Sequence, residues 1–386
     1  MKRTIVIFVI FVTHVALGWG EAGHHLVGRL SAKLLAHHPL IVAKFGHEMV
    51  LQERRRKNAF LNTFYERRFM LGHLGNIPDT YWRNLEESKT RMGNPTHYLN
   101  REIVLEMESQ VGFAIPKIPA DYETAKRLVK KDKPKVNFFE QIGTLPWRAQ
   151  QFANLYFQSL KQLPREACET LANQKKSHTL EVLTFAGLMS HFTADASVPL
   201  HATKYYDGKE RDQKGLHSYW ESDLVDALEE EDLEKKVWNR ALGELSEGTF
   251  FEAAKKKYPN EDSKNRVAAY LLTLLDDSAL QIPSLESLDR KYALKRCPNN
   301  EKNVCRKAPW EKVEGKTIAQ WNEPVIVERL ALAVAVTTHI WATLWQEVGA
   351  DDLCFTWDYA HKPEWISPTD PKVAGYETPN RRGKSR

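Results

Sequence analysis

Apolar residues recur along most of the chain at the three- and four-residue spacing of an amphipathic α-helix. This spacing predicts helices over residues 26–37, 41–52, 65–74, 145–162, 179–196, 217–230, 233–257, 265–279 and 318–348. The alternating pattern of a half-buried strand is nearly absent, and no internal repeat is found. We therefore expect an all-α protein, a single helical domain with long loops.

Proline, glycine and polar residues interrupt this pattern at a few places. The interruptions are a turn or helix start at residues 76–79, a break at 93–96, a surface excursion at 116–134, a polar loop at 205–215 and irregular chain over 283–316. Asp79 and His97 stand beside two of these breaks, where side chains can reach into a helical bundle.

The first eighteen residues differ from the rest of the chain. Two basic residues precede an apolar run at residues 5–12, and Ala16 and Gly18 stand three and one positions before Trp19. This is the pattern of a secretory signal peptide cleaved before Trp19, so we expect a secreted or periplasmic protein. The expected division is a signal peptide at 1–18, a helical domain at 19–350 and a loop and tail at 351–386.

No later segment is expected to span a membrane. The most apolar stretch, residues 325–345, carries Glu328, Arg329 and His339, and is therefore interpreted as a buried helix with a hydrogen-bonded core histidine. The histidines without neighbouring carboxylates or turns are interpreted as surface residues: His37, His38, His47, His178 and His361.

Composition and charge exclude few classes of protein or substrate. The chain has 386 residues, 27% charged and 42% apolar, as in an ordinary soluble protein. Loss of Lys2 and Arg3 with the signal peptide lowers the net charge from +5 to +3. Basic runs at residues 54–57, 130–135, 255–257 and 381–386 permit a polyanionic substrate, although solvated surface explains each of them.

Four cysteines in an exported chain indicate up to two disulfides. They are Cys168, Cys297, Cys305 and Cys354. Cys297 and Cys305 flank a Pro-Asn-Asn turn and are the favoured pair, but three connectivities remain open.

The candidate chemistry centres on an H-x3-D-x5-H pattern formed by His191, Asp195 and His201. On a helix His191 and Asp195 share one face, and imidazole and carboxylate are common zinc ligands. A second pair with four-residue spacing, His217 and Glu221, would complete a set of two histidines and one carboxylate with His201.

The predicted new N-terminus adds further ligands. Cleavage before Trp19 frees an α-amine with a pKa of about 8, which could chelate a metal together with the Trp19 carbonyl oxygen. His24 follows five residues later, with His25 as its rival.

Trp-Gly-x-x-Gly-His at a mature N-terminus, followed by these spaced Asp, His and acidic residues, resembles the zinc-dependent single-strand nucleases. That family contains mung bean nuclease and its fungal relatives, and it shares a helical trinuclear-zinc fold with bacterial zinc-dependent phospholipases C. The resemblance covers roughly residues 19–224. It implies three zinc ions, the first held by Asp79, His97, His191 and Asp195, the second by Trp19, His24 and the shared Asp195, and the third by His201, His217 and Glu221.

Four positions depart from the nuclease pattern. Glu221 replaces an aspartate and agrees with the phospholipases, and residues 205–208 replace a Gly-Gly-Asn stretch. Arg83 stands one residue later than the family's arginine, and Asn100 replaces an acidic residue. The resemblance therefore favours metal binding more strongly than any one substrate.

The expected function is phosphodiester hydrolysis of single-stranded DNA, RNA or nucleotides by a monomer, in which zinc lowers the pKa of an attacking water. The catalytic candidates are Asp79, Glu102 as proton acceptor and Arg83 as phosphoryl partner. The candidates for base stacking are Tyr98, Tyr205, Tyr206 and Tyr219, although core or surface packing also explains these tyrosines. The alternatives are a zinc-dependent phospholipase C and a non-catalytic zinc-stabilised binding protein.

Overall fold

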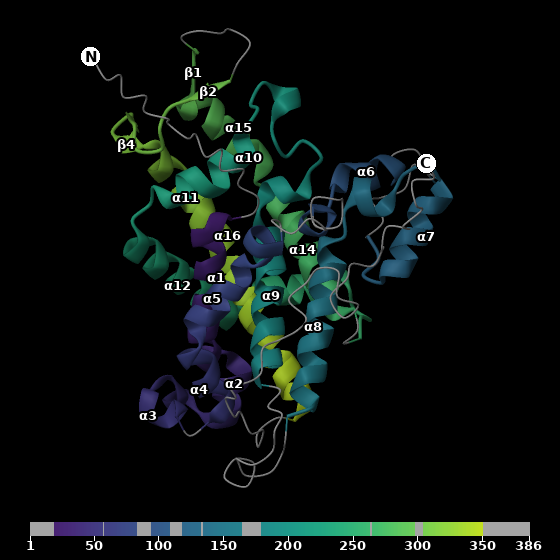
Figure 1. Cartoon of the computed structure of the whole chain (residues 1–386), viewed down its shortest axis with the longest axis vertical. Helices are drawn as coiled ribbons and strands as arrows, with labels where there is room; N and C mark the ends of the chain where they lie inside the picture. The colour runs from purple at the N-terminus through teal and green to yellow at the C-terminus, as the bar shows by residue number, and fades with distance from the viewer. Residues whose placement is uncertain are drawn as a thin grey trace, which may run out of the picture.

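Six long or central helices lie against one another and bury most of the core (Figure 1). They are α1 (Gly20–Leu34), α5 (Arg68–Asn76), α8 (Leu145–Lys161), α9 (Thr179–Ser197), α14 (Arg266–Ala279) and α16 (Ile318–Val348). This computed structural model describes residues 19–56, 58–82, 94–108, 118–132, 134–163, 179–262, 265–297 and 304–349. Within these residues the protein is predominantly helical, which confirms the expected all-α class.

Helix α9 lies at the centre, in contact with α1, α5, α8, α14 and α16. All but two of its residues are buried, although it carries polar side chains such as His191, Thr193 and Asp195. A helix that is buried on every side is apolar by default, because unpaired polar groups are costly in the core. The polar residues of α9 therefore mark an internal site.

Glycines allow α1, α5 and α9 to approach one another closely. A Cβ atom on Gly187 of α9 would lie 2.4 Å from Leu74 Cβ of α5. A Cβ atom on Gly28 of α1 would lie 2.7 Å from the Leu71 carbonyl oxygen of α5. Side chains at these two positions would force the helices apart, so the glycines set the distance across which residues of the three helices can meet.

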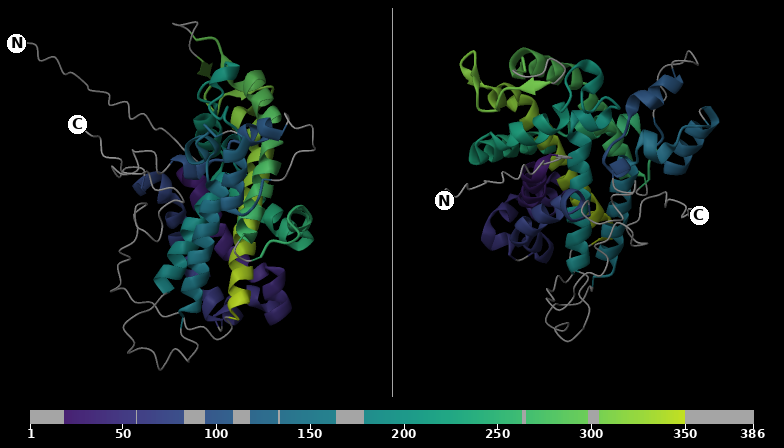
Figure 2. Two further views of the ribbon diagram at one scale, coloured as in Figure 1. Left: turned by 90° about the vertical axis from the view of Figure 1, so that its right-hand side faces the viewer. Right: turned by 45° about the horizontal axis from the view of Figure 1, so that its top comes forward.

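Helix α16 runs along the length of the molecule beside the central helices (Figure 2). It has the predicted bounds because Thr317 and Gln320 form a capping box at its start and Gly349 ends it with φ +66°. Of the described helices, α16 alone is long and apolar enough to cross a membrane, and 78% of its most apolar window is buried in the protein. This burial agrees with the interpretation of a core helix.

The other described helices surround these six. They are α2 (Pro39–Phe45), α3 (Gln52–Arg55), α4 (Ala59–Glu66), α6 (Arg101–Glu108), α7 (Tyr122–Asp132), α10 (Leu216–Ser218), α11 (Leu224–Asp226), α12 (Glu230–Glu247), α13 (Thr249–Lys257) and α15 (Ile282–Leu288). Single 3-10 turns lie at Leu35–His37, His47–Val50, Asn94–His97, Pro199–Ala202 and Lys209–Arg211. Single π-helical turns lie at Pro78–Trp82, Phe138–Ile142, Tyr219–Asp223 and Asp289–Ala293.

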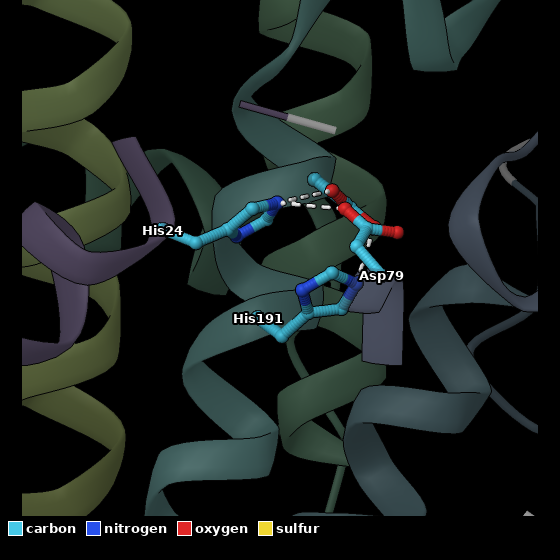
Figure 3. Close-up of side chains that lie close together, drawn as sticks. His24, Asp79 and His191 are labelled. Carbon is cyan, nitrogen blue, oxygen red and sulfur yellow. Dashed lines mark ion pairs between the residues drawn. The ribbon is translucent and has the colours of Figure 1, made fainter. Parts of the chain in front are cut away.

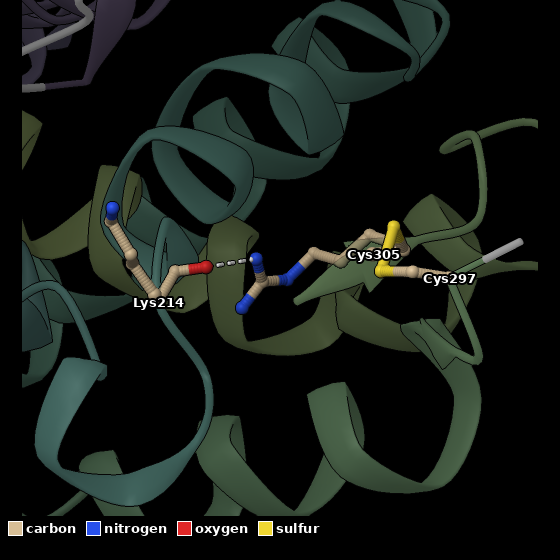
Figure 4. The surroundings of a disulfide bond; sticks show 4 residues. Lys214, Cys297 and Cys305 are labelled. Carbon is tan, nitrogen blue, oxygen red and sulfur yellow. Dashed lines mark hydrogen bonds between the residues drawn. A yellow bond between two sulfur atoms is a disulfide. The ribbon is translucent and has the colours of Figure 1, made fainter. Parts of the chain in front are cut away.

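Two small antiparallel hairpins complete the described structure. Strands β1 (Leu294–Lys295) and β2 (Cys305–Arg306) pair with each other, as do β3 (Lys312–Val313) and β4 (Lys316–Thr317). A disulfide joins Cys297 to Cys305, which confirms the favoured pair (Figure 4). Cys168, Cys354, the expected signal peptide at 1–18 and the expected tail at 351–386 lie outside the described residues.

Several predicted helices are interrupted in the structure. The prediction of one helix over 41–52 is wrong because Gly46 turns the chain with φ +83°, and the helix over 233–257 divides at Gly248 with φ +69°. Glycine adopts this backbone conformation without steric cost. The segment 217–230 is divided into α10, a π-helical turn and α11, because the hydrogen bonding changes after Ser218.

Two segments are more regular than expected. The polar excursion at 116–134 contains α7, because Tyr122, Ala125 and Val129 form a narrow buried stripe among charged residues. The segment expected to be irregular, 283–316, contains α15 and both hairpins.

The assignment of His38 to the surface is also wrong. His38 is buried, its Nδ1 accepts a hydrogen bond from Leu40 N, and its Nε2 lies 3.1 Å from His339 Nδ1. His339 also contacts the Tyr270 hydroxyl at 3.2 Å, as expected for a hydrogen-bonded core histidine.

Candidate metal centre

The first group of ligand-type side chains is built on α9. His191 and Asp195 are four residues apart, and His191 Nε2 lies 3.1 Å from Asp195 Oδ2. Both side chains are fully buried. The helical spacing therefore places imidazole and carboxylate at one point inside the core, as the sequence pattern predicts.

Two more members of this group come from α1 and from the π-helical turn after α5. His24 Nε2 lies 3.4 Å from Asp79 Oδ2 and 3.3 Å from Asp195 Oδ1. In Figure 3, His24 and His191 extend from separate helices toward Asp79. His25 instead contacts the His73 ring at 4.9 Å between centroids, so His24 and not His25 joins the group.

His97, at the end of the 3-10 turn Asn94–His97, lies among the same atoms. Its Nδ1 is 2.9 Å from Asp195 Oδ2, 2.9 Å from His191 Nε2 and 3.6 Å from Asp79 Oδ1. Four separate segments thus bring three histidines and two carboxylates together, and their donor atoms could hold metal ions.

A second group is formed by His201, His217 and Glu221, whose ligand-type atoms lie within 4.8 Å of one another. His217 Nε2 is 3.0 Å and His201 Nε2 is 3.6 Å from Glu221 Oε2. The other nitrogen of His201, Nδ1, lies 3.7 Å from Asp195 Oδ1. His201 therefore links the two groups, because its two ring nitrogens face one carboxylate of each.

One backbone group orients His191, and no sequence signal indicates it. The Nδ1 atom of His191 lies 2.8 Å from the Gly75 carbonyl oxygen, to which it can only donate. This hydrogen bond leaves the lone pair on Nε2, which faces the group. Second partners of this kind commonly fix the tautomer of metal-binding histidines.

The buried carboxylates dominate the electrostatics. Burial lowers the pKa of His24, but Asp195 and Asp79 outweigh burial and raise it to about 9. Burial opposes the charge on Asp195, yet nearby His191 and His201 hold its pKa well below the usual value. Burial, reinforced by His217, lowers the pKa of His201 to about 3. A proton on His24 thus balances part of the anionic charge, a task that a bound metal cation would also perform.

Several buried polar atoms fit a bound cation. Within the described residues, both ring nitrogens of His24, Asp79 Oδ2, Asp195 Oδ1 and His201 Nδ1 make no well-formed hydrogen bond. Buried polar groups are normally satisfied, because an unpaired one costs about 1–3 kcal/mol. Nitrogen and oxygen donors gathered around unsatisfied carboxylates are the donor set of a divalent transition metal.

Trp19 is held at the end of α9. Its indole Nε1 donates to the Ala194 carbonyl oxygen and to Ser197 Oγ, both at 2.9 Å, and its ring contacts Trp220 at 5.0 Å. Its carbonyl oxygen accepts a hydrogen bond from Gly23 N at 3.2 Å. In the uncleaved chain the Trp19 nitrogen belongs to a peptide bond, so its role as an amine ligand stays a prediction.

A cleft of about 250 Å³ opens beside both groups, since His97, His201 and His217 line it. The other lining residues are Asn94, Tyr98, Asn100, Leu200, Thr203, Lys204 and Tyr206. Tyr206 is 49% exposed, and its ring meets the His217 ring edge-on at 5.4 Å. Two of the four stacking candidates, Tyr98 and Tyr206, thus line the cleft, whereas Tyr205 and Tyr219 do not. Their role in stacking stays a prediction.

Tyr205 and Glu102 have other described neighbours. Two cations contact the Tyr205 ring, with Lys204 Nζ at 5.1 Å and the Arg211 guanidinium at 5.0 Å from its centroid. Glu102 accepts hydrogen bonds from the Thr203 hydroxyl and, at 3.1 Å, from Lys204 N. Among the described contacts, none joins Glu102 to the two ligand groups, so its role as a proton acceptor stays a prediction. Arg83 lies outside the described residues.

The fold and the site together define a helical protein with two linked groups of buried metal-ligand side chains. Comparison with known proteins identifies no relative, because no family model, curated protein or solved structure matches the chain.

Proposed function

We propose that the protein is an exported zinc-dependent phosphodiesterase that hydrolyses single-stranded nucleic acid. The observation that carries this proposal is the convergence of eight ligand-type side chains on two linked groups beside one cleft. These side chains come from seven helices and helical turns between residues 20 and 223. Structural ion pairs rarely need so many histidines at one buried point, whereas a polynuclear metal centre does.

Zinc suits these residues because all of them are imidazoles or carboxylates. We propose three ions, the first held by Asp79, His97, His191 and Asp195, the second by Trp19, His24 and Asp195, and the third by His201, His217 and Glu221. Bound zinc would supply Lewis acidity, which polarises phosphoryl oxygens and lowers the pKa of water.

The chain's own residues supply the substrate contacts. Lys204 lines the cleft and adds positive charge beside His201, where a phosphodiester would gain from it. The half-exposed Tyr206 offers an aromatic face next to His217, on which an unpaired base can stack. Glu102 fixes the loop after His201 through Thr203 and Lys204, and so positions the cation of the cleft.

A zinc-dependent phospholipase C is the second candidate. Glu221 favours it, because the nucleases that this chain resembles carry aspartate there and the phospholipases carry glutamate. Both enzymes hydrolyse a phosphodiester, so the chemistry at the metal ions would be the same for the two substrates. The stacking surface of Tyr206 favours a substrate that contains a base.

The direct experiment incubates zinc-loaded protein that begins at Trp19 with single-stranded DNA, RNA, a 3′-nucleotide and phosphatidylcholine. We expect cleavage of the nucleic acids. Cleavage of the lipid alone would establish the phospholipase instead, and no turnover at full zinc occupancy would favour a non-catalytic zinc-stabilised protein. His217→Ala should lose turnover, whereas His38→Gln, which replaces a buried histidine outside both groups, serves as the matched control.

A further inference from the structure

The segment that carries His217 also supports a separate part of the molecule. We define the basic lobe as residues 289–297 and 304–317, which hold both hairpins. Arg306 donates a hydrogen bond to the Gln213 carbonyl oxygen at 2.6 Å. It also donates to the Lys214 carbonyl oxygen at 2.8 Å, the bond drawn in Figure 4. The Tyr219 hydroxyl donates to the Lys307 carbonyl oxygen at 3.0 Å. The segment 213–219 therefore faces the cleft through His217 and contacts the basic lobe through Gln213, Lys214 and Tyr219.

The basic lobe is fixed to this segment rather than loosely attached. The Cys297–Cys305 disulfide and the β1–β2 pairing close its first hairpin. Arg306 also pairs with the buried carboxylate of Asp289, with Nε 2.7 Å from Oδ1. Tyr292 stacks on Trp321 of α16 with ring centroids 4.5 Å apart. A bound partner would thus meet a surface whose position relative to the cleft is set in advance.

Charge distinguishes the basic lobe from the rest of the surface. Eight residues of the basic lobe are Lys or Arg, and three are acidic (Asp289, Glu311 and Glu314), an excess of five positive charges, as many as the net charge of the whole chain. The basic residues are Arg290, Lys291, Lys295, Arg296, Arg306, Lys307, Lys312 and Lys316. Most of them are exposed. An excess of this size creates a local positive potential that attracts polyanions.

The basic lobe also exposes an indole. Trp310 is 71% exposed and stands between Lys307 and Lys312 in the sequence. It sits in a turn closed by Glu311, whose backbone N–H donates to the Ala308 carbonyl oxygen and whose side chain accepts from Ala308 N. A large aromatic side chain that is held out by a closed turn among cations is suited to contact a partner.

We propose that the basic lobe is an accessory binding surface for the single-stranded nucleic acid substrate, outside the cleft. The lysines would neutralise backbone phosphates, and Trp310 would stack on an unpaired base. A membrane is the less suitable partner, because Trp310 is the lobe's single highly exposed large apolar side chain among the described residues. This inference rests on the proposed function, since it names how the same substrate extends beyond the cleft.

Comparing a long and a short substrate distinguishes binding at the basic lobe from catalysis in the cleft. We would measure kcat/KM for a thirty-nucleotide oligothymidylate and for a thymidine dinucleotide, which is too short to span the cleft and the basic lobe. The variants are Trp310→Ala and the triple change Lys307→Gln, Lys312→Gln and Lys316→Gln. The matched control removes three exposed cations elsewhere, by Lys235→Gln, Arg240→Gln and Lys256→Gln.

We expect Trp310→Ala to lower kcat/KM for the long strand about tenfold and to leave the dinucleotide unchanged. The triple variant should make the logarithmic salt dependence shallower by about 2, because each lost phosphate contact contributes roughly 0.7 for a single strand. The control triple should change neither quantity. Equal rates for both lobe variants and the wild type on the long strand would overturn the inference.

The remaining outcomes distinguish a failure of the proposed hydrolytic function from a failure of the proposed accessory surface. If the wild type hydrolyses neither substrate, the proposed function fails, and the uncleaved oligonucleotide can be used to compare binding by fluorescence anisotropy. Weaker binding by the lobe variants would then still support the accessory surface. Sedimentation with phosphatidylserine vesicles that depends on Trp310, without binding of the oligonucleotide, would overturn the inference in favour of a membrane.

Discussion

Asp195→Asn tests the centre most directly, because this carboxylate contacts three histidines of the first group and one of the second. The side chain of Asp195 lies 3.3 Å from His24, 2.9 Å from His97, 3.1 Å from His191 and 3.7 Å from His201. Asparagine keeps the size of the side chain, but removes its charge and replaces one oxygen with an N–H donor. The change therefore removes a ligand while adding no bulk to the core.

The expected loss of zinc follows from the number of ions that Asp195 would bind. In the proposed arrangement two of the three ions use this carboxylate, so Asp195→Asn should reduce three zinc ions per chain to one. Glu221→Gln should reduce three to two, because Glu221 lies in the second group alone. Each filled site stabilises the folded state by about 2.7 kcal/mol at one hundred times its Kd. The stabilisation by zinc should thus fall by about 5 kcal/mol in Asp195→Asn.

Two measurements check this expectation on protein that begins at Trp19. Elemental analysis after dialysis gives the number of zinc ions per chain, and urea unfolding with zinc and with EDTA gives the stabilisation by metal. Glu231→Gln, an exposed change on α12, should keep all three ions. Three ions in Asp195→Asn, or equal losses in Asp195→Asn and Glu221→Gln, would refute the shared carboxylate.

Three further predictions concern the scaffold. Burial lowers the pKa of His38 to about 4. Below pH 6.5 the unfolded chain therefore binds a proton at His38 that the folded protein excludes. Between pH 7 and 5 the free energy of unfolding of the wild type should fall by about 2 kcal/mol more than that of His38→Gln. Parallel urea-stability curves for the two proteins over this range would contradict that reasoning. Gly187→Ala places a Cβ 2.4 Å from a leucine of α5, so it should lower the free energy of unfolding in urea by about 1–3 kcal/mol and lower the zinc occupancy. Gly243→Ala is the control, because a Cβ there meets nothing within 4 Å. Equal stability of the two variants would refute the close packing. Replacing Cys297 and Cys305 by serine should cost about 2.5 kcal/mol, because the disulfide closes a short loop; unchanged stability in urea would show that the pair does not constrain the unfolded chain.

Much of the helical framework follows from local sequence. The periodicity of residues 318–348 is long and has a capping signal at each end, so α16 matches its prediction residue by residue. The same holds closely for α9, where His191 and Asp195 share a face through helical spacing alone. The periodic pattern does not indicate the breaks at Gly46 and Gly248, because a glycine inside a periodic segment does not reveal which sign of φ it adopts.

The order and spacing of the ligands along the chain also carry information about the site. His201, His217 and Glu221 can be grouped from the sequence, because His217 and Glu221 have the spacing of one helix face and His201 precedes them by only sixteen residues. His24 and Asp79 can be included only by resemblance, since no local pattern joins residues 55 positions apart.

Sequence by itself thus determined the helices α9 and α16 and the types of ligand side chain, and it favoured the observed disulfide pair, because these depend on spacing within short segments. Only the tertiary structure decided that Gly75 orients His191, that Tyr206 rather than Tyr205 lines the cleft, and that the basic lobe is hydrogen-bonded to the segment that carries His217. Each of these contacts depends on how closely separate segments approach one another. That distance is set by packing between helices, such as the contact of Gly187 with α5, and cannot be derived from either segment alone.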